Sequence, residues 1–281
     1  MFDRILGLDE GHTDVFRGPN PGDWPGGRVF GGLVAAQALR AATRTVGAGH
    51  LPHSLHAYFV RPGRPGVPID HAVDRTRDGR SFTTRRVDSR QDGEVIFTLS
   101  ASFHTTEPGP EYQLPMAADV AAPEDLDPPG WPFSPSGALR NLELREVGPT
   151  PPEPDGTYRS TRRVWVRALE VGDDPLLHAC VLTFMSDLGV VMAARPPRPG
   201  ATWDSVMTAS LDHAVWFHRP ARADQWLLYD LHALANHGAR GMVRGVIHDR
   251  SGTLIASVAQ EVLVRPLREG PPPGSPESPP L

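Results

Sequence analysis

The chain has 281 residues, of which 39% are hydrophobic and 22% are charged, a composition that is typical of a globular protein with one large core or two modest ones. The net charge of −5 and the pI near 6.2 leave no basic footprint, which argues against nucleic acid as a partner. Acidic residues occupy the N-terminus where a signal peptide needs a long apolar stretch, and no run approaches the roughly 18 apolar residues of a membrane helix, so we expect a cytoplasmic protein without membrane contact.

The residue types exclude several kinds of catalytic site. All 28 residues counted as Lys or Arg are arginines, so there is no Schiff-base lysine, P-loop lysine or serine–lysine dyad. The single cysteine, Cys180, excludes an intrachain disulfide and a multi-cysteine zinc site. His53 and His56 lie three apart in an alternating strand pattern and would face opposite sides of it. We therefore expect neither a metal site nor a cofactor.

Residues 1–110 have the pattern of an α+β unit. A glycine-rich entry leads into residues 33–46, which are rich in alanine, contain no Gly or Pro, and predict a helix that is buried on nearly every side. Four runs rich in β-branched and aromatic residues then predict antiparallel strands, with hairpin-type turns at Asp78-Gly79 and Asp92-Gly93. These runs are residues 55–60, 69–76, 81–89 and 95–104.

Two stretches rich in proline lie outside the expected units. Residues 111–155 read as a connection, with one short element expected around residues 139–144. Residues 266–281 cannot form a packed core, so we expect a disordered tail.

Residues 156–265 predict a second α+β unit. A strand at residues 158–168 is followed by Asp174 and Pro175, an acidic cap and a proline that favour a helix start. The helix that follows, residues 176–188, is again apolar on nearly every side. Further strands are predicted at residues 208–218, 226–233, 241–249 and 253–264.

The two units repeat each other in part. The run His-Ala-Tyr-Phe-Val-Arg-Pro at 56–62 matches Ala-Val-Trp-Phe-His-Arg-Pro at 214–220, and the turn at Asp92-Gly93 matches the turn at Ser251-Gly252. The offsets nearly agree, since 220 − 62 is 158 and 252 − 93 is 159. Such spacing predicts a duplicated structural unit, and a tandem pair can bury a site between its halves.

A series of motifs in both units carries a resemblance to a known family. In the first unit they are Arg28-Val-Phe-Gly-Gly32, Gln37-Ala-Leu, residues 53–63, Arg77-Asp-Gly-Arg-Ser-Phe82 and Arg85-Arg-Val. In the second unit they are Ser186-Asp187-Leu188, residues 210–220, residues 226–229, Ala239-Arg-Gly241 and residues 256–261. Over roughly residues 20–265 the chain resembles the acyl-CoA thioesterase II family, the TesB-like enzymes. The resemblance implies an α+β tandem (double) hot-dog fold, in which two buried helices are each wrapped by an antiparallel sheet.

The resemblance also implies an activity and its residues. The family hydrolyses acyl-CoA thioesters to free acid and CoA, with an Asp, a Thr or Ser, and a Gln that activate a water molecule. By motif these fall on Asp187, Ser210 and Gln260, which can accept a proton and orient water without a covalent nucleophile. Backbone N–H groups of Gly31 and Gly32 are candidate oxyanion donors. A homodimer or homotetramer is expected as well.

The CoA phosphates need cations, and arginine is the only one that this chain offers besides histidine. Arg61, Arg77 and Arg85 lie in or beside the motifs of the first unit, and each of them is an equally good candidate for a structural ion pair.

Simpler explanations exist for each catalytic candidate. Asp187 can be a solvated acid at the end of a helix, Ser210 a strand hydroxyl and Gln260 a polar residue on a solvent face. Asp212 would share a strand face with Ser210 and is a competing candidate for the catalytic acid. Cys180 lies near His178 and invites a nucleophile interpretation, but residues two apart on a helix point in different directions, which favours core packing.

The sequence departs from the family at residues 231–238, usually rich in small hydroxyl residues, and at Val262, where glycine is common. The family resemblance therefore does not predict the shape of the acyl pocket. Two other functions are considered: a catalytically weak acyl-CoA binding or sensing protein of the same fold, and a hot-dog hydratase, for which no paired Asp/His motif is evident.

Overall fold

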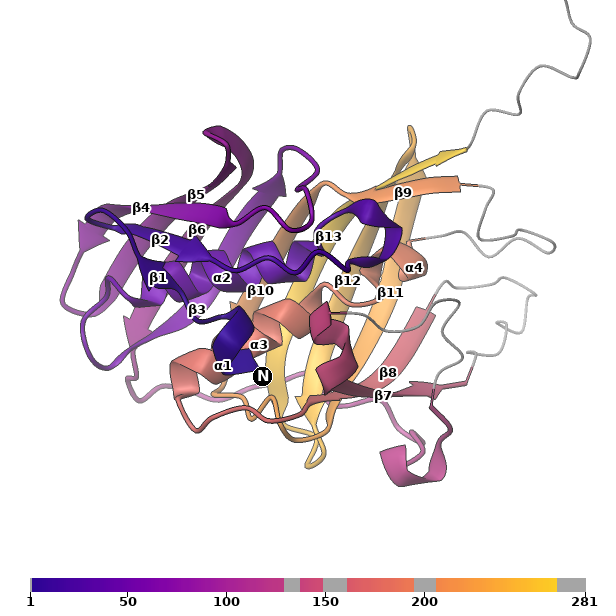
Figure 1. The fold of residues 1–281 in the computed structure, drawn as a ribbon. Coiled ribbons are helices and arrows are strands. Elements are labelled where there is room, and N and C mark those ends of the chain that lie inside the picture. The colour runs from indigo at the N-terminus through magenta and orange to yellow at the C-terminus, as the bar shows by residue number, and fades with distance from the viewer. Residues whose placement is uncertain (1, 129–136, 149–160, 195–205, 267–281) are drawn as a thin grey trace, which may run out of the picture.

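The structure, a computed structural model, describes residues 2–128, 137–148, 161–194 and 206–266 (Figure 1). The α-helices of this part of the chain are α1 (Phe2–Ile5), α2 (Gly31–Thr43), α3 (Pro175–Ser186) and α4 (Val190–Ala193), and short 3₁₀ helices lie at Pro25–Gly27, Pro123–Asp125 and Gly137–Asn141. The strands are β1 (Asp9–Glu10), β2 (Val15–Gly18), β3 (His50–Phe59), β4 (Ile69–Asp78), β5 (Phe82–Gln91), β6 (Glu94–Thr105), β7 (Leu142–Val147), β8 (Thr161–Ala168), β9 (Val206–Ser210), β10 (Asp212–Phe217), β11 (Leu227–His237), β12 (Arg240–Asp249) and β13 (Leu254–Pro266).

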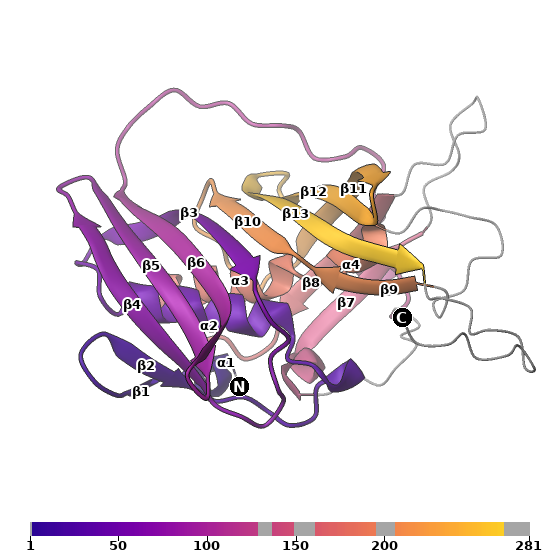
Figure 2. The same ribbon diagram turned by 90° about the horizontal axis from the view of Figure 1, so that it is seen from above.

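All of these strands belong to one antiparallel sheet. Its order is β1-β2-β4-β5-β6-β3-β10-β13-β12-β11-β8-β7, and β9 also pairs with β13. The strands of the first half are joined to those of the second half where β3 pairs with β10, with Ala57 opposite His213 and Leu55 opposite Val215. Figure 2 shows the sheet curving around α2 and α3, so both helices lie on its inner side.

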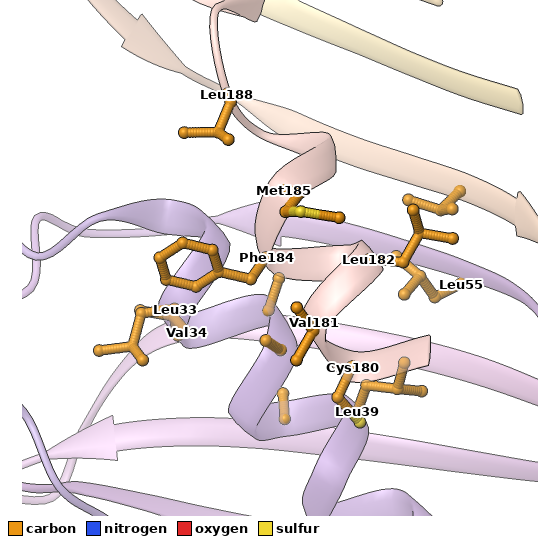
Figure 3. Close-up of a cluster of buried hydrophobic side chains, with 14 of the residues drawn as sticks. Leu33, Val34, Leu39, Leu55, Cys180, Val181, Leu182, Phe184, Met185 and Leu188 are labelled. Carbon is orange, nitrogen blue, oxygen red and sulfur yellow. The ribbon is translucent and has the colours of Figure 1, made fainter. Parts of the chain in front are cut away.

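The two long helices are buried because their side chains suit an enclosed position. Five alanines of α2 are 0% exposed, and small side chains of this kind let a helix approach its neighbours closely (Ala35, Ala36, Ala38, Ala41 and Ala42). The apolar side chains of α2 pack with those of α3 and the sheet, as the close-up in Figure 3 shows for Leu33 and Val34 of α2 and Val181 of α3. The tightest approach is at Gly32, where an added Cβ would lie 2.4 Å from the carbonyl oxygen of Phe184.

The start of α3 is as predicted. Asp174 is the N-cap and accepts a hydrogen bond from the N–H of Leu176 at 3.0 Å, and Pro175 occupies the first turn. The same carboxylate accepts a bond from Arg40 of α2 at 2.8 Å, which ties the two helices together. After α3, Gly189 adopts a left-handed conformation with φ of 74° and turns the chain into α4.

The apolar character of this region exceeds the expectation from the sequence. The segment Pro175–Ala193, which contains α3 and α4, reaches the length and hydropathy of a membrane-spanning helix, with a mean hydropathy of 1.8. However, 72% of its most apolar window is buried inside the fold, so its composition follows from its place in the core.

The repeated runs of the sequence make the same contacts in both halves. The N–H groups of Val60 and Arg61 both donate to the carbonyl of Ile96, and those of His218 and Arg219 both donate to the carbonyl of Ile255. The side chains follow the same pattern, since Arg61 donates to Val95 O at 2.8 Å and Arg219 to Leu254 O at 3.2 Å.

The boundaries of several elements differ from the prediction. The run expected as one strand at residues 208–218 is divided at Leu211 into β9 and β10. At this point the Asp212 carboxylate, rather than a backbone carbonyl, accepts the N–H of Glu261 at 2.6 Å, and the carbonyl of Leu211 accepts from Phe59 N at 3.0 Å. The interruption ends β9 at Ser210.

Other differences lie at the ends of the expected units. The elements α1, β1 and β2 were not predicted, because they are too short to give a periodic signal in the sequence. Within the stretch expected as a connection, the short element expected at residues 139–144 is divided: residues 139–141 end a 3₁₀ helix (Gly137–Asn141), and residues 142–144 begin β7, which pairs with β8 at the edge of the sheet. Residues 129–136 and 149–155 of that connection, the start of the strand expected at 158–168, and residues 267–281 of the expected tail lie outside the described residues.

Candidate active site

The three candidate catalytic side chains meet although they come from three separate elements. Asp187 is the C-cap residue of α3, Ser210 ends β9, and Gln260 lies in the middle of β13. The pairing of β9 with β13 places Ser210 opposite Val262, two residues along the strand from Gln260. The local fold therefore brings together residues that are up to 73 positions apart, since 260 − 187 is 73.

A chain of hydrogen bonds links the three side chains, and each donor points along it from Gln260 through Ser210 to Asp187. The amide Nε2 of Gln260 donates to Ser210 Oγ at 2.7 Å, and the hydroxyl of Ser210 points to Asp187 Oδ1 at 3.5 Å. The second distance is long for an O–H···O bond, as is common at catalytic sites without substrate. Gln260 is fully buried rather than on a solvent face.

Asp187 is a buried acid whose charge is partly compensated. It is 6% exposed, and burial raises its pKa from 3.8 to about 7, while hydrogen bonds from the Gln260 amide, the Gly32 N–H and the Ser210 hydroxyl act to lower it. A carboxyl group with a pKa near neutral can take up and release a proton under physiological conditions.

The start of α2 faces this carboxylate. The Gly32 N–H donates to Asp187, so in this structure it stabilises the ionised acid. Gly31 lies beside the same group, since an added Cβ would be 2.8 Å from Asp187 Oδ2 and 2.6 Å from Cε1 of Phe59. Of the two oxyanion candidates, Gly31 also lines the adjoining cavity.

Asp187 and Ser210 lie in the wall of a cavity of about 480 Å³, a size within the usual range for small-molecule sites. The other lining residues are mainly apolar and include Phe30 and Val34 from the start of α2 and Val191 and Met192 from α4. The cavity thus combines an apolar compartment with a polar pair at its wall.

The arginine candidates occupy different environments. Arg61 is exposed and lines the cavity. Arg77 and Arg85 are not among the lining residues, and the side chain of Arg85 is fully buried and donates to Thr45 and Asp78. For Arg85 the structural interpretation therefore holds, because its N–H groups are already used inside the fold. Arg28, which was not among the predicted candidates, lines the cavity and is exposed, and its side chain makes no ion pair or hydrogen bond within the part of the chain that the structure describes.

Comparison with known proteins identifies the family. Two family profiles match, described as "Acyl-CoA thioesterase N-terminal domain" over residues 20–104 and "Acyl-CoA thioesterase C-terminal domain" over residues 117–264. The chain is 35% identical to human acyl-coenzyme A thioesterase 8 and 32% identical to acyl-CoA thioesterase 2 of Haemophilus influenzae. Each alignment covers 93% of this chain, and they cover 88% and 96% of the two relatives. The chain belongs to the TesB-like acyl-CoA thioesterase II family.

Solved structures agree with this family assignment. The crystal structure of the acyl-CoA thioesterase II TesB2 from Mycobacterium marinum is similar with a TM-score of 0.81 and 39% identity, covering 95% of this chain and 99% of that one. A protein from Alicyclobacillus acidocaldarius described as having a hot-dog fold has a TM-score of 0.78 at 21% identity, covering 95% and 98% of the two chains. This second likeness shows the hot-dog fold.

Within this member of the TesB-like family, the competing candidates have other roles. The Asp212 carboxylate accepts the N–H of Glu261 in the sheet and does not line the cavity. Cys180 is fully buried, and burial raises the pKa of its thiol to about 12, so it stays protonated and packs in the core. His178 accepts a bond from the N–H of Ala223 through Nδ1 at 3.2 Å.

Two buried residues near the site were missed by the sequence analysis. Tyr229 donates to the carbonyl of Ser186 at 2.7 Å and so holds the last turn of α3 next to Asp187. His213 contacts Gln260. His213 lies in the run 210–220 that carried the resemblance, but its partner is 47 residues away, and no local pattern predicts that contact.

A methyl group at position 31 is expected to destabilise this TesB-like protein. Gly31→Ala would press on Phe59 and the Asp187 carboxylate, and crowding of this kind costs about 1–3 kcal/mol. Gly109→Ala is the matched control, because a Cβ there meets nothing within 4 Å. Urea unfolding of the two variants tests the expectation, and equal free energies of unfolding would contradict it.

The stability of the protein is also expected to depend on Asp187 in a defined pH range. Because its pKa is raised from 3.8 to about 7 in the folded state, folding favours the protonated acid, and stability is lost as the pH rises between these values. Asp187→Asn removes this loss, so the variant should gain about 3–4 kcal/mol relative to the parent protein between pH 4 and pH 8. The measurement is urea unfolding of both proteins across this range, and a difference that does not vary with pH would show that the acid is not perturbed.

Proposed function

We propose that this protein hydrolyses acyl-CoA thioesters to free acid and CoA, with a water molecule activated by Asp187, Ser210 and Gln260. The observation that carries the proposal is the hydrogen-bonded convergence of these three side chains, with Asp187 and Ser210 in the wall of an apolar cavity and Gln260 buried behind them. Membership of the TesB-like family supports it, as do the names of the human and Haemophilus relatives.

In the proposed reaction, Asp187 acts as the general base. Its ionised carboxylate takes one proton from a water molecule, whose oxygen attacks the thioester carbonyl carbon to give a tetrahedral intermediate. The C–S bond then breaks, and the proton held by Asp187 passes to the sulfur of CoA, so one water is consumed and the ionised carboxylate of Asp187 is restored. A pKa near 7 suits both halves of this cycle.

Ser210 and Gln260 orient the base and the water. The Gln260 amide fills one lone pair of Ser210 Oγ, so the Ser210 hydroxyl hydrogen is directed toward Asp187 and the remaining lone pair is left for water. For the developing oxyanion we propose the N–H of Gly31 at the start of α2, because the N–H of Gly32 is used by Asp187.

We further infer that the chain is a tandem of two hot-dog units, each with its own buried helix. The separate N- and C-terminal family profiles support this inference. So do the matching bonds of Arg61 with Val95 and of Arg219 with Leu254, which lie at nearly the same offset, since 219 − 61 is 158 and 254 − 95 is 159. In this arrangement α2 belongs to the first unit and α3 to the second.

The cavity has a place for each end of the substrate. Its apolar walls suit an acyl chain, while the exposed side chains of Arg28 and Arg61 suit the phosphates of CoA. Arg61 also donates to Val95 O, and its counterpart Arg219, which does not line the cavity, makes the matching bond to Leu254 O. We therefore assign this one bond of Arg61 a structural role. Arg28 is the stronger of the two candidates.

The alternative functions fit the site less well. A protein that only binds acyl-CoA has no use for a carboxyl group buried at the wall of an apolar cavity, where burial is costly. A hydratase of the Asp/His kind would need a histidine facing the substrate, but His213 is 1% exposed and is not part of the cavity lining.

Kinetics of four substitutions test the proposed site. Asp187→Asn removes the proton acceptor with little change in shape, so kcat should fall about 10²–10⁴-fold with KM little altered. Ser210→Ala and Gln260→Ala should each lower kcat about 10–10³-fold, and Ser210→Thr should retain activity. The measurement is steady-state release of free thiol from one good acyl-CoA by folded variants.

Two further features of these kinetics are specific to the proposal. The Ser210→Ala, Gln260→Ala double variant should lose less than the product of the single losses, because both residues serve one water. In the parent protein, kcat should rise with pH through about 7 as Asp187 ionises. An Asp187→Asn variant with near-normal kcat would overturn the assignment.

Arginine substitutions test the proposed phosphate contacts. Arg28→Ala should raise KM for acyl-CoA about 10-fold through loss of charge-assisted hydrogen bonds, and Arg61→Ala should do so to a lesser extent. Neither change should affect a pantetheine thioester, which lacks the nucleotide. Arg86→Ala, which removes an exposed charge paired with Asp88, is the control. Equal effects on both substrates would contradict nucleotide binding.

A further inference from the structure

A buried histidine, His213 in β10, connects the proposed catalytic residues to the end of α3. Its Nδ1 lies 2.5 Å from Gln260 Oε1, and its Nε2 lies 2.7 Å from Ser186 Oγ. His213 is 1% exposed and is not among the residues that line the cavity, so it cannot act on the substrate directly. It contacts instead the one member of the catalytic group that is fully buried.

The hydrogen-bond partners determine which nitrogen of His213 carries hydrogen. Burial lowers the pKa of the imidazole to about 4, so at neutral pH the ring is neutral and has a single N–H. A carbonyl oxygen of Gln260 can only accept, so Nδ1 must carry the hydrogen. Nε2 then accepts from the Ser186 hydroxyl, whose single hydrogen turns away from the alternative acceptor, the carbonyl of Thr183 at 2.8 Å.

The opposite tautomer of His213 would also satisfy its bonds with Gln260 and Ser186, but it would leave the carboxylate of Asp187 without two of its hydrogen-bond donors. If the Gln260 amide were turned around, its NH₂ group would donate to Nδ1 and its carbonyl would accept from the Ser210 hydroxyl. The ionised Asp187 would then lose both the Gln260 and the Ser210 donors that lower its pKa. The charge of Asp187 therefore selects the arrangement in which His213 donates to Gln260.

We propose that His213 is a positioning residue: as the neutral Nδ1–H tautomer it fixes the Gln260 amide so that its NH₂ group, and through it the Ser210 hydroxyl, faces Asp187. The inference rests on the proposed thioesterase function. Ser186, which directly precedes Asp187, extends the chain of hydrogen bonds back to the helix that carries the acid. The orientation of the catalytic group is thus set by groups that never touch the substrate.

A pair of substitutions separates positioning from packing. His213→Leu removes the N–H donor, so Gln260 is free to turn, and kcat should fall up to about 10²-fold with KM little changed. His213→Asn places an amide donor near the position of Nδ1 and should restore much of the loss. His71 provides a matched control, because it is 0% exposed and lies between Ser89 Oγ and Gln37 Oε1 at 2.9 and 3.2 Å. His71→Leu should lower stability to a similar extent and leave kcat intact.

The pH profile gives a readout that a purely structural role would not change. Without its oriented donors the Asp187 carboxylate is less stabilised, so the acid limb of the kcat profile should move to higher pH in His213→Leu and not in His71→Leu. Two other titratable groups are linked to this site: Tyr229 of β11, whose pKa responds to the charge of Asp187, and His213 itself, which contacts Gln260. Neither changes its charge near pH 7, since burial raises the pKa of Tyr229 and lowers that of His213.

The outcomes distinguish the possible failures. An unchanged kcat and acid limb in His213→Leu would overturn the inference, as would equal losses in the Leu and Asn variants with an unshifted limb. Asp187→Asn is measured alongside, and near-normal activity there would instead refute the proposed function. If the Leu variant does not fold, imidazole ¹⁵N spectra of the parent protein decide, with the His213 signals assigned by their change in Ser186→Ala. An Nε2–H or doubly protonated ring at pH 7 would contradict the proposal.

Discussion

The close approach of two helix ends is the constraint on which the site depends. The start of α2 meets the last turn of α3 at Gly32, where there is no space for a side chain between the backbone and the carbonyl of Phe184. Only because the backbones touch here can the Gly32 N–H reach Asp187, one residue beyond α3. The positive end of one helix dipole thereby faces an acid at the negative end of another, which offsets part of the cost of burying its charge.

The two halves of the chain contribute unequally to this arrangement. The repeated bonds of Arg61 and Arg219 lie in equivalent places, which supports a duplicated origin, yet Asp187, Ser210 and Gln260 all come from the second half. The first half supplies the start of α2 and part of the cavity wall. Neither half contains both the acid and the helix end that stabilises it, so the proposed activity needs the pair. The junction of β3 with β10 holds the halves in one sheet and fixes this relation.

Much of this organisation could be predicted from local patterns in the sequence. Composition predicts the alanine-rich helix α2, and the capping pattern of Asp174 and Pro175 predicts the start of α3. The catalytic candidates came from motif resemblance, not from periodicity. What could not be predicted are long-range consequences of packing: the break at Leu211, where a side chain replaces a backbone acceptor, the burial of Arg85, and the contact of His213 with Gln260. Each depends on which strands become neighbours, and a run of residues read alone carries no such information.

The state of Asp187 reflects a balance between these long-range contacts. Burial alone would keep the acid protonated and unable to accept a proton, whereas full hydrogen bonding would hold it ionised and make it a poor base. The three donors from α2, β9 and β13 offset only part of the burial, and the resulting pKa is about 7. Each donor is held by a different part of the fold: Gly32 by helix packing, Ser210 by the end of β9, and Gln260 by its contact with His213. Because no single element sets the pKa, the proposed base is tuned by the tertiary structure as a whole, and a change in any of the three supports shifts it.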